Sequence, residues 1–167
     1  MILDSQAIVL TAFAVVMAAA AFEDFRRLVI PNLLPILLVA LWPFYFAAAP
    51  SLYGALAAIG CAAAVFVAGA ILFAFNLLGG GDVKLLAAAT LWAGPARTPE
   101  LLMLTAVLGG ALALVLLMPG AADIATAARV RLGQPPADVG HGRKMKIPYG
   151  LAIIGAALIV ILPPYFG

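Results

Sequence analysis

Charged side chains are scarce in this sequence. Of the 167 residues only 10% are Asp, Glu, Lys or Arg, whereas 66% are hydrophobic and the mean hydropathy is +1.20. An ordinary soluble domain is about a quarter charged and about half apolar. Nine basic and seven acidic residues are too few to cover a water-exposed surface. The composition therefore excludes a water-soluble enzyme, a nucleic-acid-binding protein and a disordered chain.

Cysteine and histidine are almost absent. The single cysteine, Cys61, lies in an apolar run and cannot form an internal disulfide. The single histidine, His141, lies in a glycine-rich stretch. Neither residue alone makes a metal-binding cluster, and no serine or cysteine lies beside a base. We therefore expect no metal, no cofactor and no nucleic-acid partner.

Long apolar runs are abundant. A run of about 20 apolar residues crosses a bilayer as a helix, because the backbone polar groups must then be satisfied internally. Glycine and proline separate the runs, as at Gly94-Pro95. The sequence predicts an all-α, polytopic membrane protein, with residues 1–167 forming a single membrane-embedded domain. The six transmembrane helices are expected at about 6–22, 33–49, 52–78, 82–94, 101–118 and 147–162.

The positions of the basic residues predict the orientation. With the N-terminus outside, eight of the nine fall in cytoplasmic connections and only Arg97 lies outside. Cytoplasmic loops carry an excess of Lys and Arg, so both termini are expected on the outer side. No Lys or Arg precedes the first span, which argues against a cleaved signal peptide. The cytoplasmic loop at 119–148 is expected to hold a short surface helix at 124–132, either facing substrate or lipid or acting as a basic tether.

Three of the seven acidic residues lie at the predicted cytoplasmic ends of spans: Glu23, Asp24 and Asp82. A carboxylate near membrane depth is costly unless it is paired, protonated or hydrated, so it is a candidate functional group. We expect Glu23 to face the headgroups. Asp24 and Asp82 are expected at similar depth on the same face of the membrane.

Two converging carboxylates can hydrolyse a peptide bond. Two like charges close together cannot both ionise cheaply, so the pair holds one proton and titrates as a unit. The ionised member takes a proton from the attacking water, and the protonated member hydrogen-bonds the carbonyl oxygen. Three glycines in succession, at 79–81, permit a tight turn, positive φ and close backbone approach beside Asp82.

Each aspartate taken alone has a simpler interpretation. Asp82 after glycines is compatible with a helix cap, and Asp24 is compatible with an interfacial pair with Arg26 or Arg27. Lys84, two residues after Asp82, does not face it along a helix and is interpreted mainly as an interfacial anchor.

Three strings resemble the type IV prepilin peptidase family of GxGD intramembrane aspartic proteases. Residues 79–82 read Gly-Gly-Gly-Asp, a literal G-x-G-D, followed by Val-Lys-Leu. Asp24 and Arg26 form a D-x-R string, followed by Ile-Pro-Asn at 30–32. Residues 146–150, Lys-Ile-Pro-Tyr-Gly, resemble the family's third signature at the start of the last span.

The resemblance implies that Asp24 and Asp82 are the catalytic pair. It also implies an endopeptidase of the inner membrane that removes the short basic leader of prepilin or pseudopilin precursors on the cytoplasmic side. The residues expected to support the site are Gly79, Gly80, Gly81, Arg26 and Lys84. The short form resembles peptidases of tight-adherence (Flp) pilus systems and archaeal preflagellin peptidases. Longer members carry a cysteine-containing N-terminal domain linked to methylation, so we expect cleavage without methylation here.

Two alternatives belong to other classes. A proton-coupled transporter subunit would use Asp24 and Asp82 as relay groups, but two carboxylates at one face, with none at mid-membrane, disfavour a relay. A non-catalytic pilus-assembly scaffold would tolerate Asp→Asn changes at both positions.

Overall fold

The described residues of the chain form helices and connecting turns. The computed structural model describes residues 2–47, 51–118, 120–131, 133 and 149–162, and within these ranges it contains no β-strand. The helices are α1 (Ile2–Arg27), α2 (Leu33–Phe46), α3 (Leu52–Ala74), α4 (Gly80–Leu117), α5 (Ala121–Arg131) and α6 (Tyr149–Ile161). The predicted all-α class is confirmed.

Helix α1 is longer than the predicted span at 6–22. It continues past the apolar run because Glu23 and Arg27 lie one turn apart and form an ion pair, with Oε2 and Nε separated by 3.1 Å. It ends where Leu28 adopts a positive φ of 53° and Pro31 follows. The extension places Asp24 within the last turn of a helix instead of after it.

Helix α3 ends earlier than the predicted limit at residue 78. Ser51 caps its start by accepting a hydrogen bond from the Gly54 amide (3.2 Å), and the helix ends at Ala74. Asn76 then takes a positive φ of 56°, a conformation that asparagine tolerates better than most residues. The turn leads directly into Gly79 and the start of α4.

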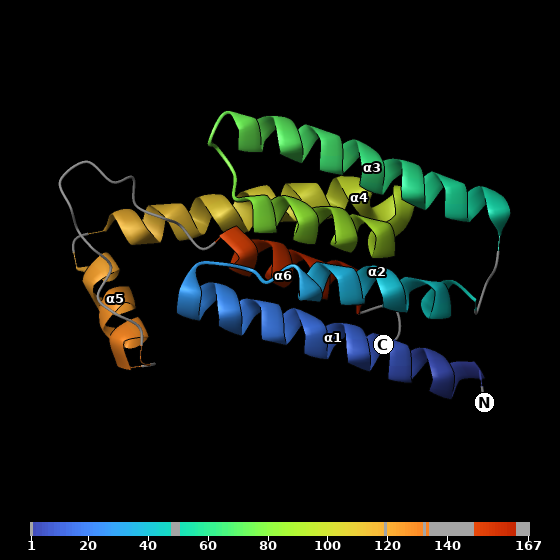
Figure 1. Cartoon of the computed structure of the whole chain (residues 1–167), viewed down its shortest axis with the longest axis horizontal. Coiled ribbons are helices and arrows are strands. Elements are labelled where there is room, and N and C mark those ends of the chain that lie inside the picture. Colours follow the sequence, from blue (N-terminus) through green and yellow to red (C-terminus); the bar gives the residue numbers. More distant parts are fainter. Residues whose placement is uncertain (1, 48–50, 119, 132, 134–148, 163–167) are drawn as a thin grey trace.

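Helix α4 is a helical hairpin. Gly94 is non-helical, with φ 65° and ψ 176°, and Pro95 follows it. In Figure 1 the first arm runs away from the α5 end of the bundle, and the second arm returns beside it towards α5. The two arms correspond to the predicted spans at 82–94 and 101–118, and the predicted break at Gly94 is confirmed.

The two remaining helices, α5 and α6, lie in different parts of the molecule (Figure 1). Helix α5 lies across one end of the bundle, at the place where the sequence predicts a short surface helix (Figure 1). Helix α6 begins at Tyr149, and the first two residues of the predicted last span lie outside the described residues, as does the predicted end of the second span.

The core lies between α1, α2, α4 and α6. Helix α4 contacts α2, α3 and α6, and α1 contacts α2 and α6. Trp92 lies in this core, where its ring packs against Phe13 and Tyr45 at centroid distances of 4.6 and 5.0 Å. Its Nε1 donates a buried hydrogen bond to the Leu38 carbonyl (2.9 Å), which ties α4 to α2.

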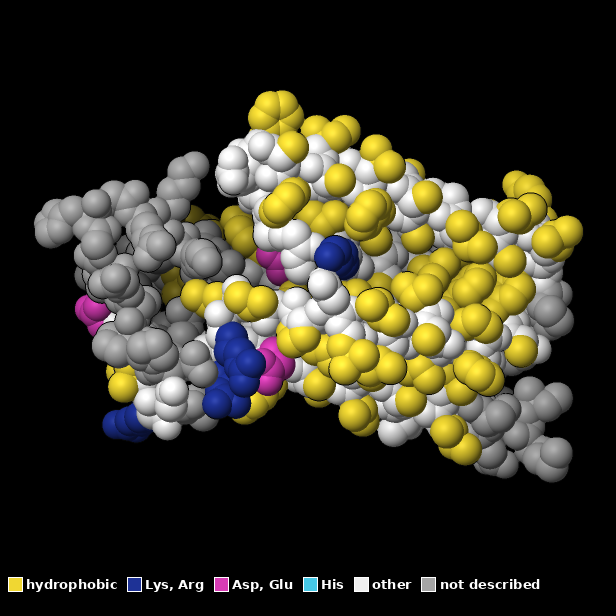
Figure 2. Space-filling model, in the orientation of Figure 1, with side chains coloured by type: hydrophobic (Ala, Val, Ile, Leu, Met, Phe, Trp, Pro, Cys, Tyr) yellow, Lys and Arg dark blue, Asp and Glu magenta, His cyan; other side chains and the backbone are white. Residues whose placement is uncertain are grey.

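The outer surface is apolar. Three of the described helical segments are long and apolar enough to cross a membrane: Gln6–Arg27, Leu52–Ala74 and Gly80–Leu117. Large hydrophobic side chains are exposed along α3, among them Leu56, Phe66 and Ile71. Figure 2 shows hydrophobic side chains over most of the visible described surface, with charged side chains gathered towards one end. Apolar patches on this scale are suited to lipid and not to water.

Candidate active site

Asp24 is the one charged residue among the buried residues that the structure describes. It lies in the last turn of α1 and is 4% exposed. Its neighbour Glu23 instead pairs with Arg27 on the surface of the same turn. A buried carboxylate is costly unless its surroundings compensate it, so the burial of Asp24 marks this end of the bundle as a candidate site.

Asp82 lies in the first turn of α4. Gly79 is the residue that precedes the helix, and the Asp82 carboxylate accepts a hydrogen bond from the Gly79 backbone N–H. This is the acidic half of a capping box, in which the third helical residue reaches back to the cap. A Cβ on Gly79 would lie 2.6 Å from Asp82 Oδ2. Gly79 therefore leaves room for the Asp82 carboxylate.

Ile30 links the three strings of the sequence at one point. A Cβ on Gly81 would lie 3.0 Å from Ile30 Cβ and 3.3 Å from its carbonyl oxygen. A Cβ on Gly150 would lie 2.9 Å from Ile30 Cδ1 and 2.6 Å from Asp24 Oδ2. Glycine at both positions lets α4 and α6 approach the end of α1 closely. The close backbone approach predicted for the glycines is therefore observed.

Residues 79–81 do not use the positive φ that glycine permits. Gly79 has φ −75°, and the positive-φ glycines of the described chain are Gly94, Gly120 and Gly133. The backbone at 79–81 needs no left-handed residue because it passes straight from an extended cap into a helix. These glycines allow close packing. A Cβ on Gly80, for example, would lie 3.3 Å from the ring of Phe73.

The two aspartates belong to one electrostatic site. Asp24 and Asp82 are far apart in the sequence, yet their charges interact. Asp24 is buried and Asp82 is partly buried, so their interaction is screened less than it would be between two exposed carboxylates. Two carboxylates placed in this way can share one proton, which is the arrangement that general acid–base hydrolysis requires.

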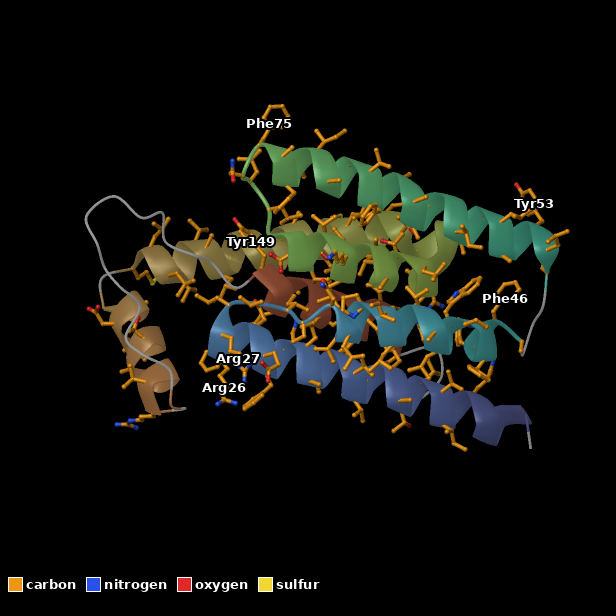
Figure 3. The ribbon with its side chains drawn as sticks, viewed as in Figure 1. Arg26, Arg27, Phe46, Tyr53, Phe75 and Tyr149 are labelled. Atoms are coloured by element: carbon orange, nitrogen blue, oxygen red, sulfur yellow. The ribbon has the colours of Figure 1, made fainter. Side chains whose placement is uncertain are left out.

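Lys84 and Arg26 differ in their relation to this site. Lys84 Nζ donates a hydrogen bond to Asn32 Oδ1 (2.8 Å), next to the segment that carries Ile30. Arg26 follows Asp24 by two positions, so it points to a different side of α1. Figure 3 shows Arg26 and Arg27 together at the outer edge of the bundle, away from Tyr149. The structure thus places the exposed Lys84 against Asn32, beside the site, and the half-buried Arg26 on another side of α1.

Two residues of the site, Ile30 and Gly150, were not singled out as site residues by the sequence reasoning. Both belong to the strings that carry the resemblance, which was the one available signal. Their role depends on contacts between helices that no local pattern shows. Tyr149 adds a similar contact, since a Cβ on Gly109 would lie 3.3 Å from its ring. Lys146 of the third string lies outside the described residues, as does His141.

Metal-binding residues do not cluster in the described part of the chain. No group of three or more His, Cys, Asp or Glu side chains capable of holding a metal ion occurs there. Cys61 lies within α3 and is partly exposed.

The fold and the site define a helical membrane protein with two interacting aspartates from different helices at one end of the bundle. The model of the type IV leader peptidase family matches residues 11–114 of the chain. This range contains Asp24 and Asp82 and covers more than half of the sequence, so the chain belongs to this family and is a peptidase. Comparisons with curated proteins and with solved structures found no match.

Proposed function

We propose that the protein is an aspartic endopeptidase of the inner membrane that removes the basic leader from prepilin-like precursors, including Flp-type pilins. Asp24 and Asp82 are the catalytic pair in this proposal. The observation that carries it is the burial of the Asp24 carboxylate at the point where α1, α4 and α6 meet, close enough to the first turn of α4 for its charge to act on Asp82.

The proposed reaction needs only the two side chains and water. One aspartate, ionised, takes a proton from water as the oxygen attacks the scissile carbonyl. The other, protonated, donates a hydrogen bond to the carbonyl oxygen. The first aspartate then gives the proton it took from water to the leaving amine, so that the pair returns to one ionised and one protonated carboxyl group. Low solvent exposure around Asp24 strengthens these electrostatic interactions. No metal or cofactor takes part in this proposal.

The expected arrangement in the membrane completes the proposal. The two arms of α4 cross the membrane as separate spans, giving six with α1, α2, α3 and α6. The two termini lie outside, and the aspartates face the cytoplasm. A precursor anchored by its apolar helix then presents its polar leader at the membrane surface, where the site lies.

Replacing either aspartate tests this function. Asp24→Asn and Asp82→Asn keep size and hydrogen-bonding capacity but remove proton transfer, so each is expected to lower the cleavage rate by a factor of about 10³ or more. The assay is cleavage, followed by mass spectrometry, of a synthetic precursor by the purified full chain in liposomes. The precursor carries a short basic leader ahead of an apolar segment of about 20 residues.

Two matched variants serve as controls. Glu23→Gln makes the same type of change one residue from Asp24, at a side chain that faces Arg27. Asp123→Asn makes it in the first turn of the peripheral helix α5. Both are expected to cleave at the wild-type rate. Cleavage that survives both Asp24→Asn and Asp82→Asn would refute the assigned pair.

A further inference from the structure

The short segment between α1 and α2 carries Ile30 into the site. Ile30 is 6% exposed, whereas its neighbours Val29, Pro31 and Asn32 are exposed. This single buried side chain contacts both Gly81 and Gly150. The position of the segment therefore determines how closely the ends of α1, α4 and α6 approach.

Asn32 occupies the N-cap position of α2, but its side chain does not cap the helix. It precedes α2, where an asparagine side chain ordinarily accepts a hydrogen bond from an amide of its own helix. In this structure Asn32 makes no side-chain capping bond, and its backbone is in the right-handed helical region. Its Oδ1 instead accepts a hydrogen bond from Lys84 Nζ (2.8 Å).

The donor of this hydrogen bond, Lys84, belongs to α4, the helix that carries Asp82. It lies two residues after Asp82 in the first turns of α4, and its neighbour Val83 is buried against Gly69 of α3. The backbone that bears Lys84 is therefore held by packing. A hydrogen bond from an ammonium group to an amide oxygen is stronger than one between neutral groups.

We propose that Lys84 and Asn32 are positioning residues, which hold the segment at 28–32 against α4 so that Ile30 keeps Asp24 and Asp82 in register. The inference rests on the proposed function of the two aspartates. Lys84 does not touch the substrate in this account. It acts through Asn32 on Ile30, and through Ile30 on the relative position of the two catalytic helices.

A double-mutant cycle tests the inference. Lys84→Met and Asn32→Leu each break the same hydrogen bond, so each is expected to lower kcat about tenfold with KM unchanged. Because both act through one contact, the double variant is expected to be no slower than either single variant. The assay is cleavage of the synthetic precursor by the purified full chain in liposomes, with folded protein verified by thermal unfolding.

Conservative variants show whether a lower kcat reflects the lost hydrogen bond or a protein that no longer folds. Lys84→Arg keeps a cationic donor and Asn32→Asp keeps an acceptor, so each is expected to recover most of the lost kcat. Arg131→Met removes one cation from the exposed end of α5 and is the matched control, with wild-type kinetics expected.

Three results would overturn the inference while Asp24→Asn stays inactive. They are a wild-type kcat for Asn32→Leu, losses that multiply to about a hundredfold in the double variant, or a raised KM for Lys84→Met alone. The last result would make Lys84 a substrate contact. An active Asp24→Asn variant would instead overturn the proposed function, and this inference with it.

Discussion

At the scale of single residues, burial separates Asp24 from the other acidic side chains that the structure describes. Asp24 is 4% exposed, while Glu23, one residue away, pairs with Arg27 at the surface. The sequence predicted that Asp24 and Asp82 lie at similar depth on one face of the membrane, and the structure shows that the charge of Asp24 acts on Asp82. The sequence could not predict that Ile30 lies between Gly81 and Gly150, since this contact depends on the packing of three helices.

Gly150→Ala tests whether the close approach of α6 matters for the site. The added Cβ would lie 2.6 Å from Asp24 Oδ2 and 2.8 Å from its Cγ, so the carboxylate or the helix must move. A displacement of about 1 Å at a catalytic group costs on the order of a hundredfold in rate. We therefore expect Gly150→Ala to fold and to lose about a hundredfold in kcat.

Gly110→Ala is the matched control for this substitution. Gly110 also lies within a helix, and a Cβ there would have no atom within 4 Å. It is expected to leave the cleavage rate unchanged. Equal rates for Gly150→Ala and the wild type would show that the approach of α6 to Asp24 is not required for catalysis.

At the scale of helices, the sequence predicted the breaks between elements better than the exact ends of helices or the contacts between them. The apolar pattern predicted the first span at 6–22, but α1 extends to Arg27 because polar residues outside the apolar run also form helix. The pattern located the break at Gly94 correctly, since glycine and proline act locally. It gave no sign of the hydrogen bond from Trp92 to Leu38, which joins residues on two different helices.

Trp92→Phe tests how far this bond holds α2 against α4. Phenylalanine keeps an aromatic ring beside Phe13 and Tyr45 but cannot donate to the Leu38 carbonyl. Loss of a buried hydrogen bond is expected to lower the free energy of unfolding by about 1–2 kcal/mol. The measurement is the thermal unfolding midpoint in detergent, with the partly exposed Trp42→Phe as the matched control. Equal midpoints for the two variants would contradict this role.

At the scale of the whole molecule, the charges are distributed unequally between the two ends of the bundle. Arg26 and Arg27 lie at the end where α5 is found, and Figure 3 shows Phe46 and Tyr53 at the other end. Arg97 donates from its Nη1 to the Val160 carbonyl near the end of α6 (3.0 Å). The orientation of the chain in a membrane stays a prediction from the positions of the basic residues.

Cysteine labelling in intact cells tests this orientation. In a Cys61→Ser background, Glu100→Cys lies near the Gly94 turn and is expected to react with a membrane-impermeant maleimide from outside. Arg131→Cys, on α5, is expected to react only after the cells are lysed. The reverse pattern would place the aspartates on the outer face and contradict the proposed site of leader cleavage.

The central claim is that Asp24 and Asp82 together cut a precursor between its basic leader and its apolar segment. The most direct measurement is the mass of the products formed by the purified chain in liposomes, with EDTA present. We predict one new product that lacks only the leader, at the same rate with and without EDTA, and no product from Asp24→Asn or Asp82→Asn. Cleavage that stops in EDTA and returns with added metal, or cleavage by both Asn variants, would contradict the two-aspartate account.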